Sequence, residues 1–277
     1  MNSDTSHSNS LRDWIQSTAR AGHDIDQIVQ MMLRAGYQPR QARQLVAKIL
    51  NRPAVAIDVA MDVRNGRRSR HPEAPSQLAE GRRVDVTMSV ECPTIRVLEG
   101  LMDAQECDEL IELARPRLDR SRTVNSKGDD QLDEARTSQG MFFQVGEAPL
   151  IQRVEQRIAA LLDMPVEYGE GLQVLHYLPG QQYEPHYDWF DPTHHGFKTL
   201  TAKSGQRVAT VLIYLNTPED GGGTHFPNAR VTVTARRGTA VYFAYQSGDK
   251  DSLHAGLPVT AGEKWIATKW LRELPFV

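Results

Sequence analysis

The feature that most constrains this chain is a histidine and an aspartate placed two residues apart in a strand-like segment. Residues 181–190 read QQYEPHYDWF and contain His186 and Asp188. Side chains at positions i and i+2 of a strand point to the same face, so the imidazole and the carboxylate can bind the same cation. The pair alone also fits two hydrogen-bonded structural residues, because a chain with nine histidines can contain this spacing by chance.

A third ligand has to come from a distant segment, and His254 is the best candidate. It lies in DSLHAGLPVTAGEKW, where a turn precedes a strand-like stretch. Two imidazoles and one carboxylate on one side of a metal, with the other positions open, form the facial triad of non-haem Fe(II) oxygenases. The three residues therefore predict an Fe(II) site.

Several blocks of sequence around these residues resemble the prolyl 4-hydroxylase family of Fe(II)- and 2-oxoglutarate-dependent oxygenases. The blocks are HYDWF, RVATVLIYLNTPEDGGGTHFP and HAGLPVTAGEKWIATKW, and the likeness spans roughly residues 92–275. It implies His186, Asp188 and His254 as iron ligands, 2-oxoglutarate as co-substrate and dioxygen as oxidant. Ascorbate is a candidate additional cofactor.

The same resemblance implies which residues hold 2-oxoglutarate. Lys264, ten residues after His254, matches the family's lysine for the far carboxylate of the co-substrate. A buried cation needs such a partner, although a surface lysine would also fit the pattern. Thr224 in GGGTHFP and Tyr177 in LHYLPGQQY resemble the hydroxyl donors to the same carboxylate.

Three further residues match family positions that face a peptide or line the pocket, namely Tyr183, Arg207 and Trp270. Aromatic side chains select substrates by shape, and an arginine can bind a peptide carbonyl. Each of the three also fits an ordinary core or surface position.

The pattern of strands and helices predicts a mainly β fold with flanking helices, a double-stranded β-helix or jelly roll. Six or more short strands follow residue 171, without a parallel βαβ repeat. Two amphipathic helices precede them, one after a possible capping box of Asp103 and Glu106 and one over about residues 149–163. Helices in this position are expected to cover one sheet of the jelly roll.

The chain is expected to divide into three parts. The spacing of apolar residues in 1–52 predicts a small helical extension, with three short helical segments after about residue 11. The last two resemble ubiquitin-associated three-helix modules, which leaves open a protein-docking or dimerising role and a purely structural one. Residues 53–88 are expected to be a linker, and residues 89–277 the oxygenase domain.

Composition narrows the class of protein and its partners. The formal net charge is −3. Nucleic-acid binding is not expected, because the sequence has no basic stripe interleaved with aromatic residues. No apolar run is long enough for a membrane span, and the polar N-terminus lacks a secretory pattern. The two cysteines, Cys92 and Cys107, do not suggest a disulfide framework. We expect a cytoplasmic protein that acts without a membrane or a nucleic acid.

The leading hypothesis is a dioxygenase that hydroxylates an unactivated carbon, with a prolyl residue in a protein or peptide as its substrate. One alternative is the same chemistry on a free amino acid or small amino-acid-like metabolite. Another, from a different class, is a non-catalytic scaffold whose N-terminal helices bind a partner. The full ligand set together with Lys264 favours an enzyme, because a scaffold needs neither.

Overall fold

The computed structural model describes residues 4–23, 25–35, 37, 42, 45–46, 48–50, 72, 74–120, 122–124, 130–132, 137–246 and 248–276. The chain separates into two compact units, residues 1–66 and 67–277, and each is described by itself. No helix in these ranges is both long enough and apolar enough to cross a membrane.

The described residues of the N-terminal unit are mainly helical. It contains α1 (Asp4–Arg20) and α2 (Ile25–Arg34), and described residues between 42 and 49 are helical as well. Ile15, Ile28 and Met32 form a small apolar core with Val46. Helix α1 begins at Asp4, before the predicted start at about residue 11.

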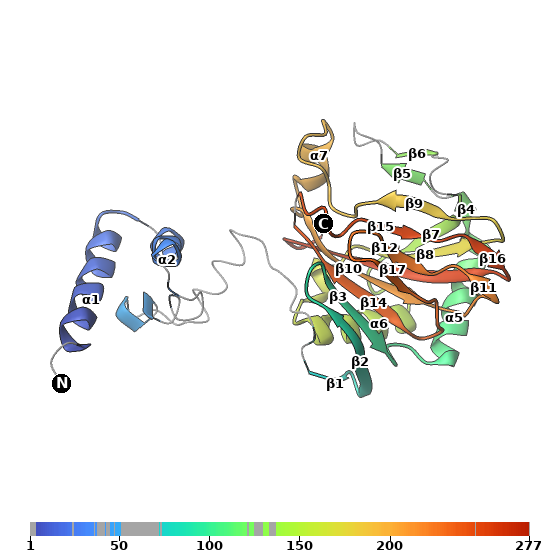
Figure 1. Ribbon diagram of the computed structural model, residues 1–277, viewed down its shortest axis with the longest axis horizontal. Helices are drawn as coiled ribbons and strands as arrows, with labels where there is room; N and C mark the ends of the chain where they lie inside the picture. Colours follow the sequence, from blue (N-terminus) through green and yellow to red (C-terminus); the bar gives the residue numbers. More distant parts are fainter. Residues whose placement is uncertain are drawn as a thin grey trace. The chain divides into compact units, whose positions relative to one another are not determined.

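The second unit is built on a large antiparallel sheet that has nine strands in the described chain (Figure 1). Register pairs connect every neighbouring pair of strands. In spatial order the strands are β1 (Ser76–Ala79), β2 (Arg82–Val90), β3 (Thr94–Glu99), β14 (Ala240–Ala244), β10 (Arg207–Tyr214), β17 (Lys264–Arg272), β8 (Leu172–Tyr177), β7 (Gln139–Phe143) and β4 (Asp119–Arg120).

A smaller sheet faces the large one and carries the histidines of interest. Its strands in the described chain are, in order, β13 (Val231–Val233), β12 (Thr224–Phe226), β15 (His254–Gly256) and β9 (Tyr183–His186). Shorter elements complete the unit: the pairs β11 (Asp220–Gly221) with β16 (Val259–Ala261) and β5 (Arg122–Val124) with β6 (Asp130–Leu132), the helix α7 (Phe197–Thr201), and the 3-10 turns η1 (Arg115–Arg117) and η2 (Val166–Tyr168).

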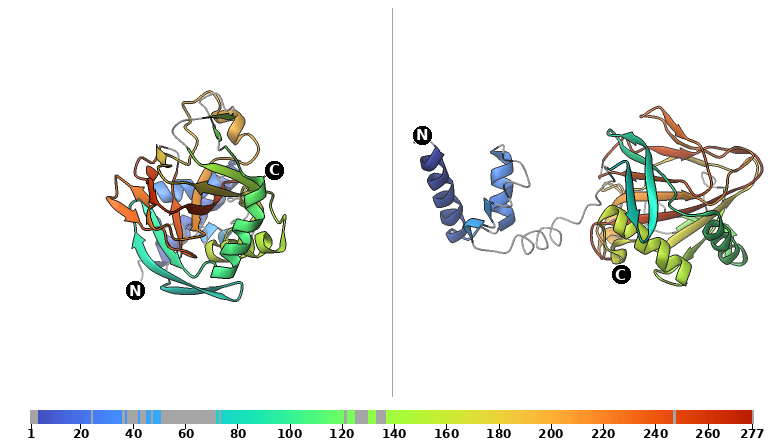
Figure 2. Two further views of the ribbon diagram at one scale, coloured as in Figure 1. Left: turned by 90° about the vertical axis from the view of Figure 1, so that its right-hand side faces the viewer. Right: turned by 90° about the horizontal axis from the view of Figure 1, so that it is seen from below.

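Helices α5 (Ala104–Ala114) and α6 (Pro149–Leu162) cover the outer face of the large sheet (Figure 2). The capping box that starts α5 is confirmed: the Asp103 carboxylate accepts a hydrogen bond from the Glu106 backbone N–H, and the Glu106 side chain accepts one from the Asp103 N–H. Apolar residues of both helices share one core cluster with the large sheet. The predicted buttressing of the sheet by helices is therefore confirmed.

Strand β17 shows how the fold creates an interior between the sheets. All of its residues are buried, because one face meets the helices and the other faces the small sheet. Trp265 and Ala267 belong to the helix-side core, whereas Ile266 belongs to the core between the sheets, with Phe243 and Phe226. Two sheets enclosing such a core form the predicted jelly roll.

The predicted linker at residues 53–88 extends too far toward the C-terminus. Strand β1 and most of strand β2 lie within it and pair with each other, and β2 pairs with β3 of the large sheet. The second compact unit starts at residue 67, so the predicted start of the oxygenase domain at residue 89 was too late. A hairpin at a sheet edge has one largely solvated face, so its sequence is polar enough to resemble a linker.

Candidate metal centre and co-substrate pocket

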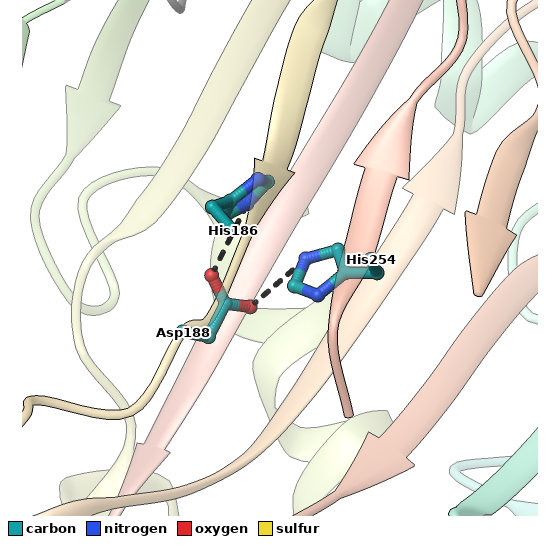
Figure 3. A group of neighbouring side chains, drawn as sticks. All are labelled: His186, Asp188 and His254. Atoms are coloured by element: carbon teal, nitrogen blue, oxygen red, sulfur yellow. Dashed lines mark ion pairs between the residues drawn. The ribbon is translucent and has the colours of Figure 1, made fainter. Parts of the chain in front are cut away.

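Three side chains converge at the end of the small sheet (Figure 3). His186 ends β9 and Asp188 follows two residues later, while His254 begins β15. One Asp188 carboxylate oxygen is 3.7 Å from His186 Nε2 and the other is 3.7 Å from His254 Nε2. One potential ligand atom from each residue lies within 4.8 Å of the others, so the predicted triad is assembled in space.

Hydrogen bonds at the far side of each imidazole determine which nitrogen is available. His186 Nδ1 is 2.8 Å from the Glu184 carbonyl oxygen, and His254 Nδ1 is 3.0 Å from the Ser252 carbonyl oxygen. A carbonyl oxygen only accepts hydrogen bonds, so each Nδ1 carries the proton. Each Nε2 faces Asp188, the arrangement typical of metal-binding histidines.

Asp188 is buried and held by residues that the sequence reading missed. Thr210 Oγ1 on β10 donates to Asp188 Oδ2 at 2.6 Å, and the Tyr245 hydroxyl lies 2.8 Å from Thr210 Oγ1. Burial raises the pKa of Asp188, whereas nearby positive charge, including that of Arg207, and the hydrogen bond from Thr210 lower it, so that the net pKa lies below its usual value. The one sequence signal for Thr210 is a hydroxyl in an otherwise apolar strand.

The donor set fits Fe(II). Two neutral imidazole nitrogens and one carboxylate oxygen are the ligands of the facial triad, which leaves positions open for other ligands. The pocket beside the three residues has about 420 Å³ of empty space, including its open mouth. Three apolar side chains, Leu175, Leu212 and Ile266, line it as well, so the open side of the triad faces a largely apolar chamber.

Lys264 lies in the same pocket, where the sequence predicted it. It starts β17 opposite Tyr177 of β8, and its side chain is buried. Its ammonium is 5.1 Å from the Tyr177 ring centroid and 6.0 Å from that of Tyr214, yet it forms no ion pair within the described ranges. Burial lowers the pKa of Lys264 to about 7, and an anionic partner would stabilise the buried ammonium.

Thr224 is also in the pocket, held by a residue that the sequence reading did not assign. The Tyr214 hydroxyl donates to Thr224 Oγ1 at 2.7 Å, and Val233 O lies 3.3 Å from the same hydroxyl. Because Thr224 accepts this bond, its own hydroxyl proton is available for an acceptor in the pocket. The predicted hydroxyl donors Thr224 and Tyr177 thus line the same pocket as Lys264.

Two of the three predicted substrate-contacting residues line the pocket. The Tyr183 ring stacks on His186 with centroids 3.6 Å apart, and Trp270 forms part of the wall. Trp270 Nε1 is buried without a hydrogen-bond partner in the described part of the chain. Both side chains are therefore placed to shape what enters the site.

Arg207 differs from its prediction, because its guanidinium already has a partner. It forms a bidentate ion pair with Glu170 at 2.7 and 2.8 Å and lies 3.9 Å from a Trp270 ring centroid. Arg272 also binds Glu170, at 2.9 Å. Arg207 is absent from the described pocket lining, so it supports Trp270 from behind. Glu170 precedes Arg207 by many residues, and no local pattern marks the pair.

Comparison with known proteins places this geometry in a family. The family model of the 2OG-Fe(II) oxygenase superfamily matches residues 172–272, which hold the triad, Lys264, Tyr177 and Thr224. Probable prolyl 4-hydroxylase 10 of Arabidopsis thaliana is 39% identical over 204 residues, which are 65% of this chain and 69% of that protein. The chain belongs to the prolyl 4-hydroxylase-like family of Fe(II)- and 2-oxoglutarate-dependent oxygenases.

Other members of this family show the same extent of similarity. Prolyl 4-hydroxylase 5 of Arabidopsis thaliana is 38% identical over 202 residues, covering 64% of this chain and 68% of that protein. The 2OG complex of the viral collagen prolyl hydroxylase from Paramecium Bursaria Chlorella virus-1 aligns with a TM-score of 0.53 at 30% identity, covering 65% of this chain and 96% of the other. As a member of this family, the chain is a dioxygenase that uses Fe(II), 2-oxoglutarate and dioxygen.

Proposed function

We propose that this dioxygenase hydroxylates a prolyl residue in a protein or peptide. The observation that carries the proposal is a buried lysine, Lys264, in the same pocket as the His186, Asp188 and His254 triad. The substrate class is supported by the similarity to prolyl 4-hydroxylases and to a collagen prolyl hydroxylase.

In the proposed site, the two Nε2 atoms and the Asp188 carboxylate hold Fe(II). Hydrogen bonds from Nδ1 to backbone carbonyls keep both imidazoles in the required tautomer. Bound Fe(II) would activate dioxygen, with 2-oxoglutarate supplying two electrons as it is converted to succinate, and the C–H bond that is hydroxylated would supply the other two. The apolar walls of the pocket exclude water from that chemistry.

Lys264 neutralises the far carboxylate of 2-oxoglutarate in the same proposal. Thr224 and Tyr177 donate hydrogen bonds to that carboxylate, and Tyr214 orients Thr224. Tyr183 and Trp270 shape the space for the substrate, with Trp270 supported by Arg207. Arg207 therefore positions the pocket wall, because its Nε and Nη2 bind Glu170 and its Nη1 donates to the Asp188 carbonyl at 3.4 Å.

The test is succinate formation from 2-oxoglutarate with Fe(II), run with and without proline-containing peptides and followed by mass spectrometry of the peptides. Gain of one oxygen on proline, coupled to succinate, supports the proposal. Succinate without modified peptide contradicts the prolyl substrate and directs the search to free amino acids or small metabolites. Ascorbate is proposed to sustain turnover, so omitting it should shorten the linear phase, and an unchanged time course would argue against that role.

We further propose a cytoplasmic location. It is supported by Cys92 and Cys107, which are both free thiols, as is usual in reducing compartments. Fractionation of cells that express the tagged chain tests the location, and recovery in an oxidising compartment would contradict it.

A further inference from the structure

Asp188 needs an external constraint, because it lies beyond the last paired residue of β9. The sheet therefore fixes His186, whereas Asp188 depends on contacts from outside β9: Arg207 Nη1 donates to its backbone carbonyl at 3.4 Å, and Thr210 donates to its carboxylate. Those contacts come from the large sheet. Thr210 lies in the middle of β10, and Tyr245 directly follows β14, whose neighbour is β10.

The hydrogen bonds among Asp188, Thr210 and Tyr245 have only one consistent direction. Thr210 Oγ1 donates its single hydroxyl proton to Asp188 Oδ2 at 2.6 Å. The 2.8 Å contact between Thr210 and Tyr245 must then be donated by the tyrosine. The result is a directed chain from the Tyr245 hydroxyl through Thr210 to the carboxylate.

The chain lies in a buried and rigid environment. Thr210 is 1% exposed and Tyr245 is 7% exposed, and the Tyr245 backbone N–H donates to the Val208 carbonyl at 3.0 Å. The Tyr245 ring also packs beside Phe243, which contacts the His254 ring. Water therefore has little access to replace either hydroxyl, and hydrogen bonds in such surroundings strengthen one another.

We propose that Tyr245 and Thr210 are positioning residues that act in series to orient Asp188 and so set the affinity of the triad for a divalent metal. Because Asp188 is the proposed carboxylate ligand of Fe(II), this role rests on the proposed function. Tyr245 reaches the carboxylate only through Thr210, which makes the order of the two residues testable.

The experiment measures Mn(II) binding to the metal-free full chain, by titration calorimetry or by the electron paramagnetic resonance of free Mn(II). Mn(II) precedes Fe(II) in the divalent first-row series and accepts the same nitrogen and oxygen ligands. Thr210→Val should weaken binding by about 10- to 100-fold, the usual effect of losing a hydrogen bond to a metal ligand. Tyr245→Phe should weaken it by roughly 2- to 10-fold, the equivalent of one net hydrogen bond.

The double variant distinguishes a series from two independent contacts. With Thr210→Val already present, adding Tyr245→Phe should cause no further loss of Mn(II) affinity, because Tyr245 is then no longer connected to Asp188 by hydrogen bonds. Thr210→Ser keeps the hydroxyl and should bind Mn(II) within about 2-fold of wild type. Tyr242→Phe is the matched control, since it removes a buried tyrosine hydroxyl from β14 on the helix side of the sheet.

Wild-type affinity in Tyr245→Phe, or full additivity in the double variant, would overturn the proposal. If Thr210→Val does not fold, Tyr245→Phe and Thr210→Ser still decide the matter. Failure of the wild-type chain to bind Mn(II) would instead overturn the proposed metal site, so the two failures are distinguishable.

Discussion

His254 lies directly opposite His186 in the antiparallel pairing of β15 with β9, and their ring centroids are 4.3 Å apart. Two histidines distant in the sequence thus sit side by side on one face of the small sheet. Asp188, two residues after His186, completes the triad from the same end (Figure 3). The register of a single strand pair therefore determines whether this site exists.

Replacing His254 with alanine should abolish metal binding and turnover. Loss of a direct ligand should cost more than the 10- to 100-fold that is typical of supporting residues, so we expect turnover to fall by more than about 100-fold. Mn(II) titration and succinate formation measure the two effects. His194→Ala is the control, because His194 is largely exposed and outside the pocket lining of the described residues; equal losses in the two variants would contradict the ligand assignment.

Lys264→Met should weaken 2-oxoglutarate binding while stabilising the ligand-free chain. A charge-assisted hydrogen bond contributes about 1.5–3 kcal/mol, which corresponds to about a 10- to 150-fold loss of affinity. Removing a buried cation without a partner should raise the melting temperature. Calorimetric titration and thermal unfolding test both directions. A melting temperature that falls along with the affinity would show that Lys264 has a stabilising partner in the ligand-free chain.

The binding of 2-oxoglutarate should take up protons above pH 7. Burial lowers the pKa of Lys264 from 10.5 to about 7 in the ligand-free chain, and a bound carboxylate raises it again. Affinity should therefore fall as the pH rises above about 7. The unfolded chain binds the extra proton between pH 7 and 10.5, so the destabilisation caused by Lys264 diminishes as the pH rises through this window.

Titration in buffers of different ionisation enthalpy measures this proton uptake. The variant Lys264→Met is the control. It should lose the proton uptake above pH 7 that the wild-type chain owes to Lys264. Uptake that is unchanged in this variant would assign the proton to another group.

Arg207→Lys should impair the peptide more than the co-substrate. Lysine can form neither the bidentate pair with Glu170 nor the flat stacking on Trp270. We expect a loss of about 1–3 kcal/mol in stability and a higher KM for peptide, with little change in the KM for 2-oxoglutarate. Steady-state kinetics with peptide and with 2-oxoglutarate as the varied substrate measure the two KM values. An equal rise in both would contradict a role of Arg207 at the pocket wall that contacts the peptide.

Deleting residues 1–66 should leave the 2-oxoglutarate chemistry intact. Both cores of the second unit are formed within residues 67–277, so the truncated chain should fold and form succinate at close to the full-length rate. A selective loss of turnover on a protein substrate would indicate that the N-terminal helices recruit it. Loss of succinate formation without any peptide would refute the independence of the two units.

Local patterns in the sequence were sufficient for much of the site. The spacing of His186 and Asp188 suggested a shared cation site, although β9 ends at His186 and Asp188 lies just beyond it. The resemblance to the family indicated Lys264, Thr224 and Tyr177 and supported His254. The structure brings these residues to one pocket. Helices α5 and α6 were also predictable, because an amphipathic stripe and a capping box are encoded within a few consecutive residues.

The tertiary structure decided the contacts between strands that are distant in the sequence. In the large sheet β10 lies between β14 and β17, and this order brings Tyr245 to Thr210 and both to Asp188. The ion pair between Glu170 and Arg207 likewise joins residues that are distant in the sequence and that only the tertiary structure brings together. Periodicity reports only which face of its own element a side chain occupies, whereas its partner depends on which strands are neighbours. The sequence by itself therefore indicated the fold class and the candidate metal ligands, and strand order decided which residues hold those candidates in place.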